Sequence, residues 1–228
     1  MPSTKIIAIR KSLSAARMGT YEATTDSNGN NITPQIALDL YAWNAQVSAA
    51  LLAPLHICEV VVRNAISEAL EAQYGSNWPQ SRGFEQSLPR SSTGYNQQKD
   101  LQSSRQRLQT AGKLTTGKLI PELKFVFWQK MLTGRHDKRL WNAYLPQIFP
   151  NLPGGKSVGQ LRQSLYDDLE HIRTLRNRIA HHEPVFNRNL TDDFQRVSNL
   201  VTFRCAVTAT WMLQNQQATK LIAARPVI

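Results

Sequence analysis

Residues 161–181 read LRQSLYDDLEHIRTLRNRIAH, and they contain the longest regular spacing of apolar residues in the chain. Large aliphatic side chains recur every three or four positions, at Leu161, Leu165, Leu169, Ile172, Leu175 and Ile179. Because an α-helix has 3.6 residues per turn, this spacing places them on one face over about six turns. Pro184 follows, and the residue before a proline avoids the helical region, so the helix should stop there. The stretch predicts a long amphipathic helix with one apolar face against a core.

Helical spacing recurs along most of the chain, and strand signals are weak. Thr33 followed by Pro34 is typical of a helix start, and Pro54 predicts a kink or break just before it. Thr191 is a candidate N-cap for the last long helix, with two aspartates in the favourable first turn. We expect further helices at about 4–17, 54–74, 121–132 and 137–148. The sequence therefore predicts an all-α protein, with one helical bundle over residues 1–228.

Residues 75–118 differ in composition from the rest of the chain. Gly, Ser, Gln and Pro dominate there, which predicts a loop-rich insertion between two halves of the bundle. Residues 96–110 could form an exposed helix, because Leu101 and Leu108 are its only large aliphatic residues. The segment is basic, and its cations form either a surface that tracks RNA or a solvated loop. These cations are Lys99, Arg105, Arg107, Lys113 and Lys118.

The charge balance suggests a class of partner. The 228 residues contain 27 Lys and Arg against 16 Asp and Glu, for a formal net charge of +11. Such a balance favours RNA, DNA or an anionic membrane surface as the partner, although it also aids solubility. The apolar run between Lys5 and Arg10 is too short for a signal peptide, and no stretch approaches the ~20 apolar residues of a membrane span. Cys58 and Cys205 lie far apart in apolar helical stretches, which indicates buried thiols in a reducing compartment. We therefore expect a cytoplasmic protein with no membrane partner.

The end of the long helix carries the candidate site. Three arginines, an asparagine and two histidines lie between Arg173 and Pro184. On a helical wheel Arg173, Asn177 and His181 fall on one side, away from the apolar stripe. An imidazole can move protons at a ribose 2′-hydroxyl and a leaving oxygen, and a guanidinium can stabilise charge on the phosphate. The set therefore suits RNA cleavage without metal, although a helix cap and a solvated arginine face remain alternatives.

A metal site is a weaker interpretation of the same residues. His181, His182 and Glu183 are adjacent, so they point to different faces of a helix and lack the i, i+4 spacing of a zinc-binding pair. We expect neither a metal nor another cofactor.

The motif also resembles a known family. Residues 176–181 (RNRIAH) are similar to the Arg–His motif of HEPN proteins. The longer string 175–186 (LRNRIAHHEPVF) resembles the Abi-like (AbiD/AbiF-type) abortive-infection proteins. Residues 41–44 (YAWN) and 55–66 (LHICEVVVRNAI) resemble the N-terminal helices of that family, and the likeness spans roughly residues 5–215.

The resemblance implies a HEPN-type helical bundle with additional N-terminal helices. It implies a metal-independent endoribonuclease that forms a homodimer, with a composite site from two motifs, and acts as a toxin-like effector of phage defence in a bacterium. Arg176 and His181 would be catalytic with Asn177 beside them, and His182 and Arg173 would support them. An antitoxin or other regulatory partner is compatible with this role. Some HEPN toxins are modified at a tyrosine two residues after the motif histidine; Glu183 occupies that position here, which argues against the same control.

A second polar set interrupts an apolar helix near the N-terminus. Glu59 and Arg63 are four residues apart, so they can form an ion pair within one helix, and Asn64 follows them. A more specific interpretation is that the three residues brace the Arg176 helix or line its cleft.

Two other functions compete with RNA cleavage. A catalytically silent HEPN module could use the same charge to bind RNA or a protein partner. A DNA-binding regulator would need a helix-turn-helix signature, which is not recognisable in this sequence.

Overall fold

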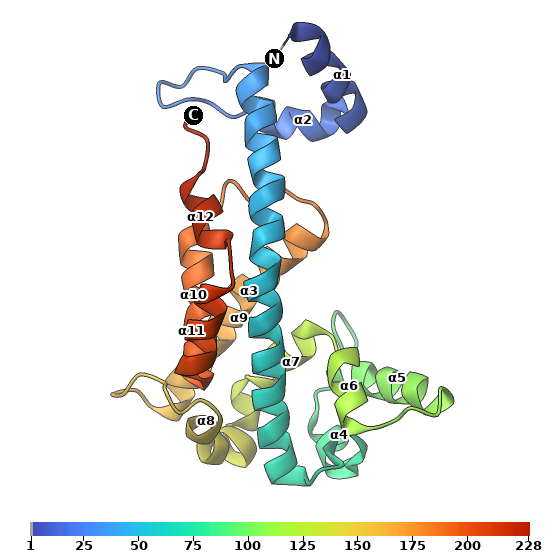
Figure 1. Ribbon diagram of the computed structural model, residues 1–228. Coiled ribbons are helices and arrows are strands. Elements are labelled where there is room, and N and C mark those ends of the chain that lie inside the picture. Colours follow the sequence, from blue (N-terminus) through green and yellow to red (C-terminus); the bar gives the residue numbers. More distant parts are fainter. Residues whose placement is uncertain (1) are drawn as a thin grey trace. The chain divides into compact units, whose positions relative to one another are not determined.

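The computed structural model describes residues 2–228, and its regular elements are helices joined by irregular segments (Figure 1). Within that range the β-structure consists of a single isolated bridge between Thr25 and Asn31. The prediction of an all-α protein is therefore confirmed. The chain divides into two compact units, each made of separate segments. Unit 1 contains the chain up to Pro54, Leu175–Gln195 and Asn215–Ile228, and unit 2 contains Leu55–Thr174 and Arg196–Gln214.

Unit 1 combines the two ends of the chain with the middle of its C-terminal half. Its complete helices are α1 (Ser3–Leu13), α2 (Ala15–Glu22) and α12 (Ala218–Ala223). It also contains the first part of α3 (Pro34–Tyr74), the end of α9 (Val158–Ala180) and the start of α10 (Leu190–Arg204). The Tyr21 ring contacts those of Tyr41 and Phe186 at 5.0 Å, and Trp43 Nε1 donates to Leu221 O at 2.7 Å. Aromatic contacts thus join α2, α3 and the segment after α9 into one core.

Unit 2 contains most of the short helices. In chain order these are η1 (Trp78–Gln80), α4 (Arg82–Ser87), α5 (Gln97–Thr110), α6 (Thr116–Glu122), α7 (Phe125–Met131), η2 (Gly134–His136), η3 (Asp137–Trp141), α8 (Asn142–Ile148) and α11 (Ala206–Gln214). Its core holds Trp78, Phe84, Phe127 and Trp128, whose neighbouring ring centroids lie 5.2–6.5 Å apart. Such edge-on aromatic packing buries a large apolar area and stabilises the unit.

The prediction that residues 75–118 are loop-rich is wrong for most of the segment. It forms η1, α4, α5 and the start of α6, which lie together in Figure 1. The predicted exposed helix is α5, and it is not fully exposed: Leu101 and Leu108 are buried, and so are Gln97, Asp100 and Ser104. Gln97 Nε2 donates to Phe127 O at 3.1 Å, and the Tyr95 hydroxyl donates to Asp100 at 2.6 Å. The segment has few aliphatic residues, and hydrogen-bonded polar side chains fill part of its interior in their place.

Two predicted helix boundaries differ from the structure. The Thr33 hydroxyl accepts from Ile36 N at 3.3 Å, which confirms that cap, but α3 continues through Pro54 to Tyr74. A proline removes one helical hydrogen bond, and the buried Leu51 and Leu55 on either side offset that loss by packing. The last long helix starts at Leu190, and its cap is Asn189 rather than Thr191, since Asn189 Oδ1 accepts from Asp192 N at 3.2 Å.

The length of α3 also bears on the membrane prediction. Without the break at Pro54, this helix of 41 residues contains an 18-residue window with mean hydropathy 1.7, of which 33% is buried. By length and composition α3 could cross a membrane. One such helix is a weak indication, because core helices of soluble proteins share these properties.

Candidate functional site

The Arg–His motif lies at the C-terminal end of α9, which has specific caps at both ends. At the start, Ser157 and Gln160 cap each other's backbone, with N–H to side-chain oxygen distances of 2.9 and 3.3 Å. At the end, His182 N donates to Ile179 O at 3.1 Å, and Glu183 N donates to Arg178 O at 2.8 Å. These two bonds define a Schellman motif, so α9 ends at Ala180 and both motif histidines lie in the turn.

His182 has an unusual backbone conformation. Its φ is +55°, in the left-handed region that glycine normally occupies at this position of a Schellman motif. Among residues 2–228 only Ser14 is another non-glycine residue with positive φ. Side chains held in this region tend to cluster at functional sites, where the surrounding structure maintains the strain.

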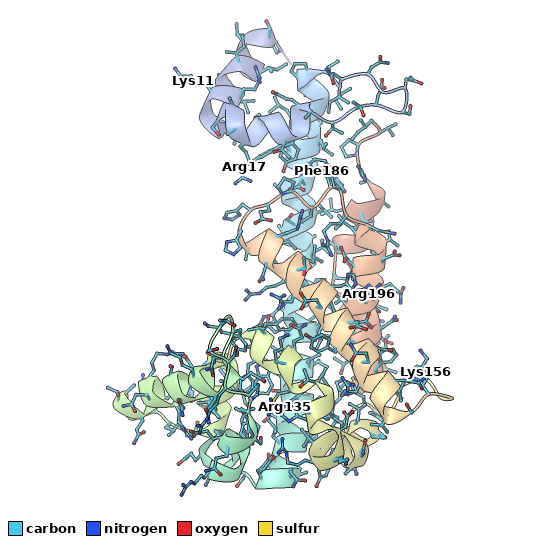
Figure 2. All side chains as sticks on the ribbon, turned by 180° about the vertical axis from the view of Figure 1, so that it is seen from behind. Lys11, Arg17, Arg135, Lys156, Phe186 and Arg196 are labelled. Carbon is cyan, nitrogen blue, oxygen red and sulfur yellow. The ribbon has the colours of Figure 1, made fainter. Side chains whose placement is uncertain are left out.

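Three side chains hold the turn and the segment that follows it. Arg17 Nη1 on α2 donates to His182 O at 2.6 Å, and Arg178 Nη1 donates to Pro184 O at 3.0 Å. Asn44 Oδ1 on α3 accepts from Val185 N at 2.8 Å. Figure 2 shows Arg17 and Phe186 in the same part of unit 1, and Phe186 is buried. The turn is therefore fixed against α2 and α3, which limits the positions that its two imidazoles can take.

The predicted catalytic side chains lie on the solvent side of this end of the helix. Arg176, His181 and His182 are exposed and Asn177 is half-buried, whereas Leu175 and Ile179 are buried. Asn177 also takes part in the helix end, because its carbonyl accepts from His181 N at 2.9 Å. The motif thus presents a guanidinium and two imidazoles to solvent from an anchored backbone.

Arg173 has a structural partner in unit 2. Its Nε lies 3.2 Å from Glu170 Oε2, and Glu170 also accepts from Gln129 of α7. The hydrogen bond from Arg173, followed by that from Gln129, outweighs burial and lowers the pKa of Glu170. Arg173 therefore serves to hold α9 to α7, and a supporting role at the motif stays a prediction.

The second polar set also lies in unit 2. Glu59 and Arg63 form the predicted ion pair within α3, and their side chains are 15% and 16% exposed. Asn64 beside them is exposed. The prediction of an ion pair within one helix is confirmed, and the prediction that these residues brace the Arg176 helix stays a prediction.

The predicted RNA-binding cations divide into engaged and exposed groups. Arg105 binds Glu85 and donates to Pro79 O at 3.1 Å, so it holds α5 to α4 and η1. Arg107 lies 3.3 Å from Glu122 but is 57% exposed, and Lys99, Lys113 and Lys118 are exposed. Lys99 and Arg107 line an open cavity of about 450 Å³ together with Lys124, which the sequence analysis did not single out.

A cavity that no sequence pattern indicated lies beside the motif. About 280 Å³ of space in unit 1 is lined on one side by His182 and Glu183, and on the other by residues of α2 and α3. The α3 residues include Tyr41 and Asn44, which belong to the 41–44 stretch that resembles the Abi-like family. Residues 41–44 and 175–186, which both resemble the Abi-like family, thus contact each other through Asn44 and Val185. That resemblance was the only sequence signal that linked the two stretches, and it did not predict their contact.

Comparisons with known proteins found no similar protein. No protein-family model, no curated sequence and no solved structure matches the chain. Within residues 2–228 no group of three His, Cys, Asp or Glu side chains is arranged to hold a metal ion. The functional interpretation therefore rests on the motif residues and their surroundings.

Proposed function

We propose that this protein is a metal-independent endoribonuclease of the HEPN type, and that it acts as a toxin-like effector of phage defence in the bacterial cytoplasm. The observation that carries the proposal is the pair of exposed residues Arg176 and His181, with the half-buried Asn177 between them, on a hydrogen-bonded helix end. The similarity of residues 175–186 to the Abi-like family supports it.

The chemistry needs a base, an acid and a stabiliser of negative charge. One imidazole removes the proton from a ribose 2′-hydroxyl, whose oxygen attacks the adjacent phosphorus. The bond to the 5′-oxygen breaks, and a second imidazole donates the proton that this oxygen takes up. The products are a 2′,3′-cyclic phosphate and a free 5′-hydroxyl. Arg176 is the group suited to stabilise the phosphate oxygens as charge builds on them.

A homodimer supplies the second imidazole in this proposal. His181 and His182 are adjacent, but His182 is held in the turn by its own backbone contacts. A two-fold axis would bring His181 of a second copy to the same phosphate, and symmetric dimers are the commonest oligomers.

Substitution of the two catalytic residues tests the proposal. We expect His181→Ala and Arg176→Ala to lower cleavage of total RNA by at least about 100-fold, in the range of general acid–base and electrostatic contributions. Both residues are exposed, so unfolding free energies should change by less than ~1 kcal/mol. His171→Ala, at an exposed histidine within α9, is the matched control and should cleave like wild type. Cleavage should persist in EDTA, and its loss with chelator would contradict the proposal.

A silent RNA-binding module is the second candidate, favoured by the net charge of +11 and the exposed Lys99, Lys113 and Lys118. Expression in a bacterial host separates the two. Toxicity of the wild type that His181→Ala removes supports the enzyme. RNA binding by both proteins, with no cleavage and equal growth, supports the module.

A further inference from the structure

The cavity beside the motif has the walls of a binding site for a flat ring. Tyr21 and Tyr41 line it from α2 and α3, and their rings meet edge to face at 5.0 Å and 67°. Ala45, Ser48 and Ala49 line it with small side chains from the next turns of α3. Tyr21 is only 1% exposed, so the half-buried Tyr41 ring and these small side chains form the part of the lining that a planar heterocycle can contact; the cavity is called the slot below.

Asn44 provides a polar group in this slot that lacks a protein partner. The residue is 6% exposed, and its Oδ1 accepts from Val185 N at 2.8 Å. Among residues 2–228, no hydrogen bond joins its Nδ2 to an acceptor. An amide Nδ2 has two donors. This nitrogen is not among the fully buried side-chain atoms that lack a partner, so it is accessible from the cavity that Asn44 lines and is available to an acceptor on a ligand.

Glu183 supplies the opposite chemistry at the rim. Its carboxylate lines the cavity, is 51% exposed, and lies 3.9 Å from the nearest guanidinium nitrogen, Arg178 Nε. That distance is too long for a hydrogen bond, so the carboxylate oxygens can accept from a ligand. The site thus offers two adjacent acceptors at Glu183 and a donor at Asn44.

We propose that this cavity binds the guanine base of an RNA substrate. Guanine presents two adjacent donors, N1–H and the N2 amino group, which match a carboxylate, and its O6 accepts from an amide donor. Adenine and cytosine present an acceptor ring nitrogen beside their single amino group, and uracil has carbonyls on both sides of its N–H. Each would place an acceptor against the Glu183 carboxylate. Reading a base through this edge while it stacks on aromatic rings is a common mode of RNA recognition.

This assignment rests on the proposed RNA cleavage for its biological meaning, and it adds a specificity to the same site. His182 lines the cavity and directly follows His181 in the chain. A guanosine whose base occupies the slot would therefore have its phosphate close to the motif. Cleavage is expected at phosphates next to guanosine.

Mononucleotide binding tests the assignment without requiring cleavage. Titration calorimetry of the intact protein with guanosine 3′-monophosphate should show saturable binding at least tenfold tighter than with the adenosine, cytidine and uridine analogues. Ala49→Leu fills the slot without removing a hydrogen bond and should abolish this binding. Ala42→Leu makes the same change at an exposed α3 position that does not line the cavity, and it should leave the binding intact. Glu183→Gln keeps the shape and should lower the guanine preference at least tenfold.

The outcomes separate this inference from the proposed function. Equal binding of all four nucleotides, no binding, or full binding by Ala49→Leu would overturn the guanine site. RNA cleavage that depends on His181 but shows no preference at guanosine would overturn it too, and would leave the nuclease standing. Selective guanosine binding in a protein that cleaves no RNA would support the guanine site and refute the nuclease.

Discussion

Replacement of His182 by glycine should stabilise the protein. The left-handed conformation costs a non-glycine residue roughly 1–2 kcal/mol, and glycine avoids that cost. Glycine loses roughly 0.5–1 kcal/mol more conformational entropy on folding, so the expected net gain is about 0.5–1 kcal/mol. Position 182 takes part in two hydrogen bonds, from Arg17 Nη1 to its carbonyl and from its N–H to Ile179 O, and both use only its backbone atoms. Glycine therefore retains them, and the bond from Glu183 N to Arg178 O does not involve residue 182. For a chain of this length the gain corresponds to a rise in Tm of about 1–4 °C.

Thermal unfolding by circular dichroism measures this effect, with His182→Ala as the matched variant. Alanine also removes the imidazole but keeps the steric cost of a Cβ at positive φ. His182→Gly should therefore melt above both wild type and His182→Ala. If the two variants melt at the same temperature, the turn is not strained by its side chain, and the argument for a functionally retained histidine fails.

Three other measurements test different parts of the structure. Burial, aided by the charges of two neighbouring arginines, lowers the pKa of His136 from its ordinary value to about 3. Below pH 6.5 the unfolded chain then binds more protons than the folded one, so the unfolding free energy should fall on acidification by up to about 1.4 kcal/mol per pH unit. Denaturant titrations between pH 6.5 and 5 should show a weaker dependence of the unfolding free energy on pH for His136→Gln than for wild type. Asn44→Ala should lower the unfolding free energy by about 1–3 kcal/mol, because the buried Val185 N–H loses its acceptor, whereas the exposed Asn64→Ala on the same helix should change it by less than 0.5 kcal/mol. Sedimentation should detect a homodimer that tightens as salt screens the clustered arginines; a monomer at every concentration that still cleaves RNA would contradict the composite site.

The sequence predicts the elements that have a single strong periodic signal. All six aliphatic residues of the 161–179 stripe are buried, at 9% exposure or less, because period and burial agree along α9. The same wheel placed His181 away from the apolar stripe, and His181 is exposed. Where a local signal competes with tertiary packing, prediction is less reliable: Pro54 indicates a break, yet α3 continues through it.

The remaining features depend on contacts that no local pattern records. The helices in 75–118 have few aliphatic residues and rely on aromatic rings and on buried amides such as Gln97. His182 occupies the left-handed position of the turn, where a glycine would have indicated the turn in the sequence. The bond between Asn44 and Val185 spans 141 positions, so the cavity beside the motif could not be assembled from sequence.

That bond also has an evolutionary consequence. The donor on one side is a backbone N–H, which any residue except proline supplies at position 185. The acceptor on the other side is a side-chain oxygen within a helix, which few residue types provide at the same reach from position 44. Among relatives that share this turn, we expect position 185 to vary among apolar residues of similar size. Position 44 should stay asparagine, and a change there should be accompanied by a rearranged turn.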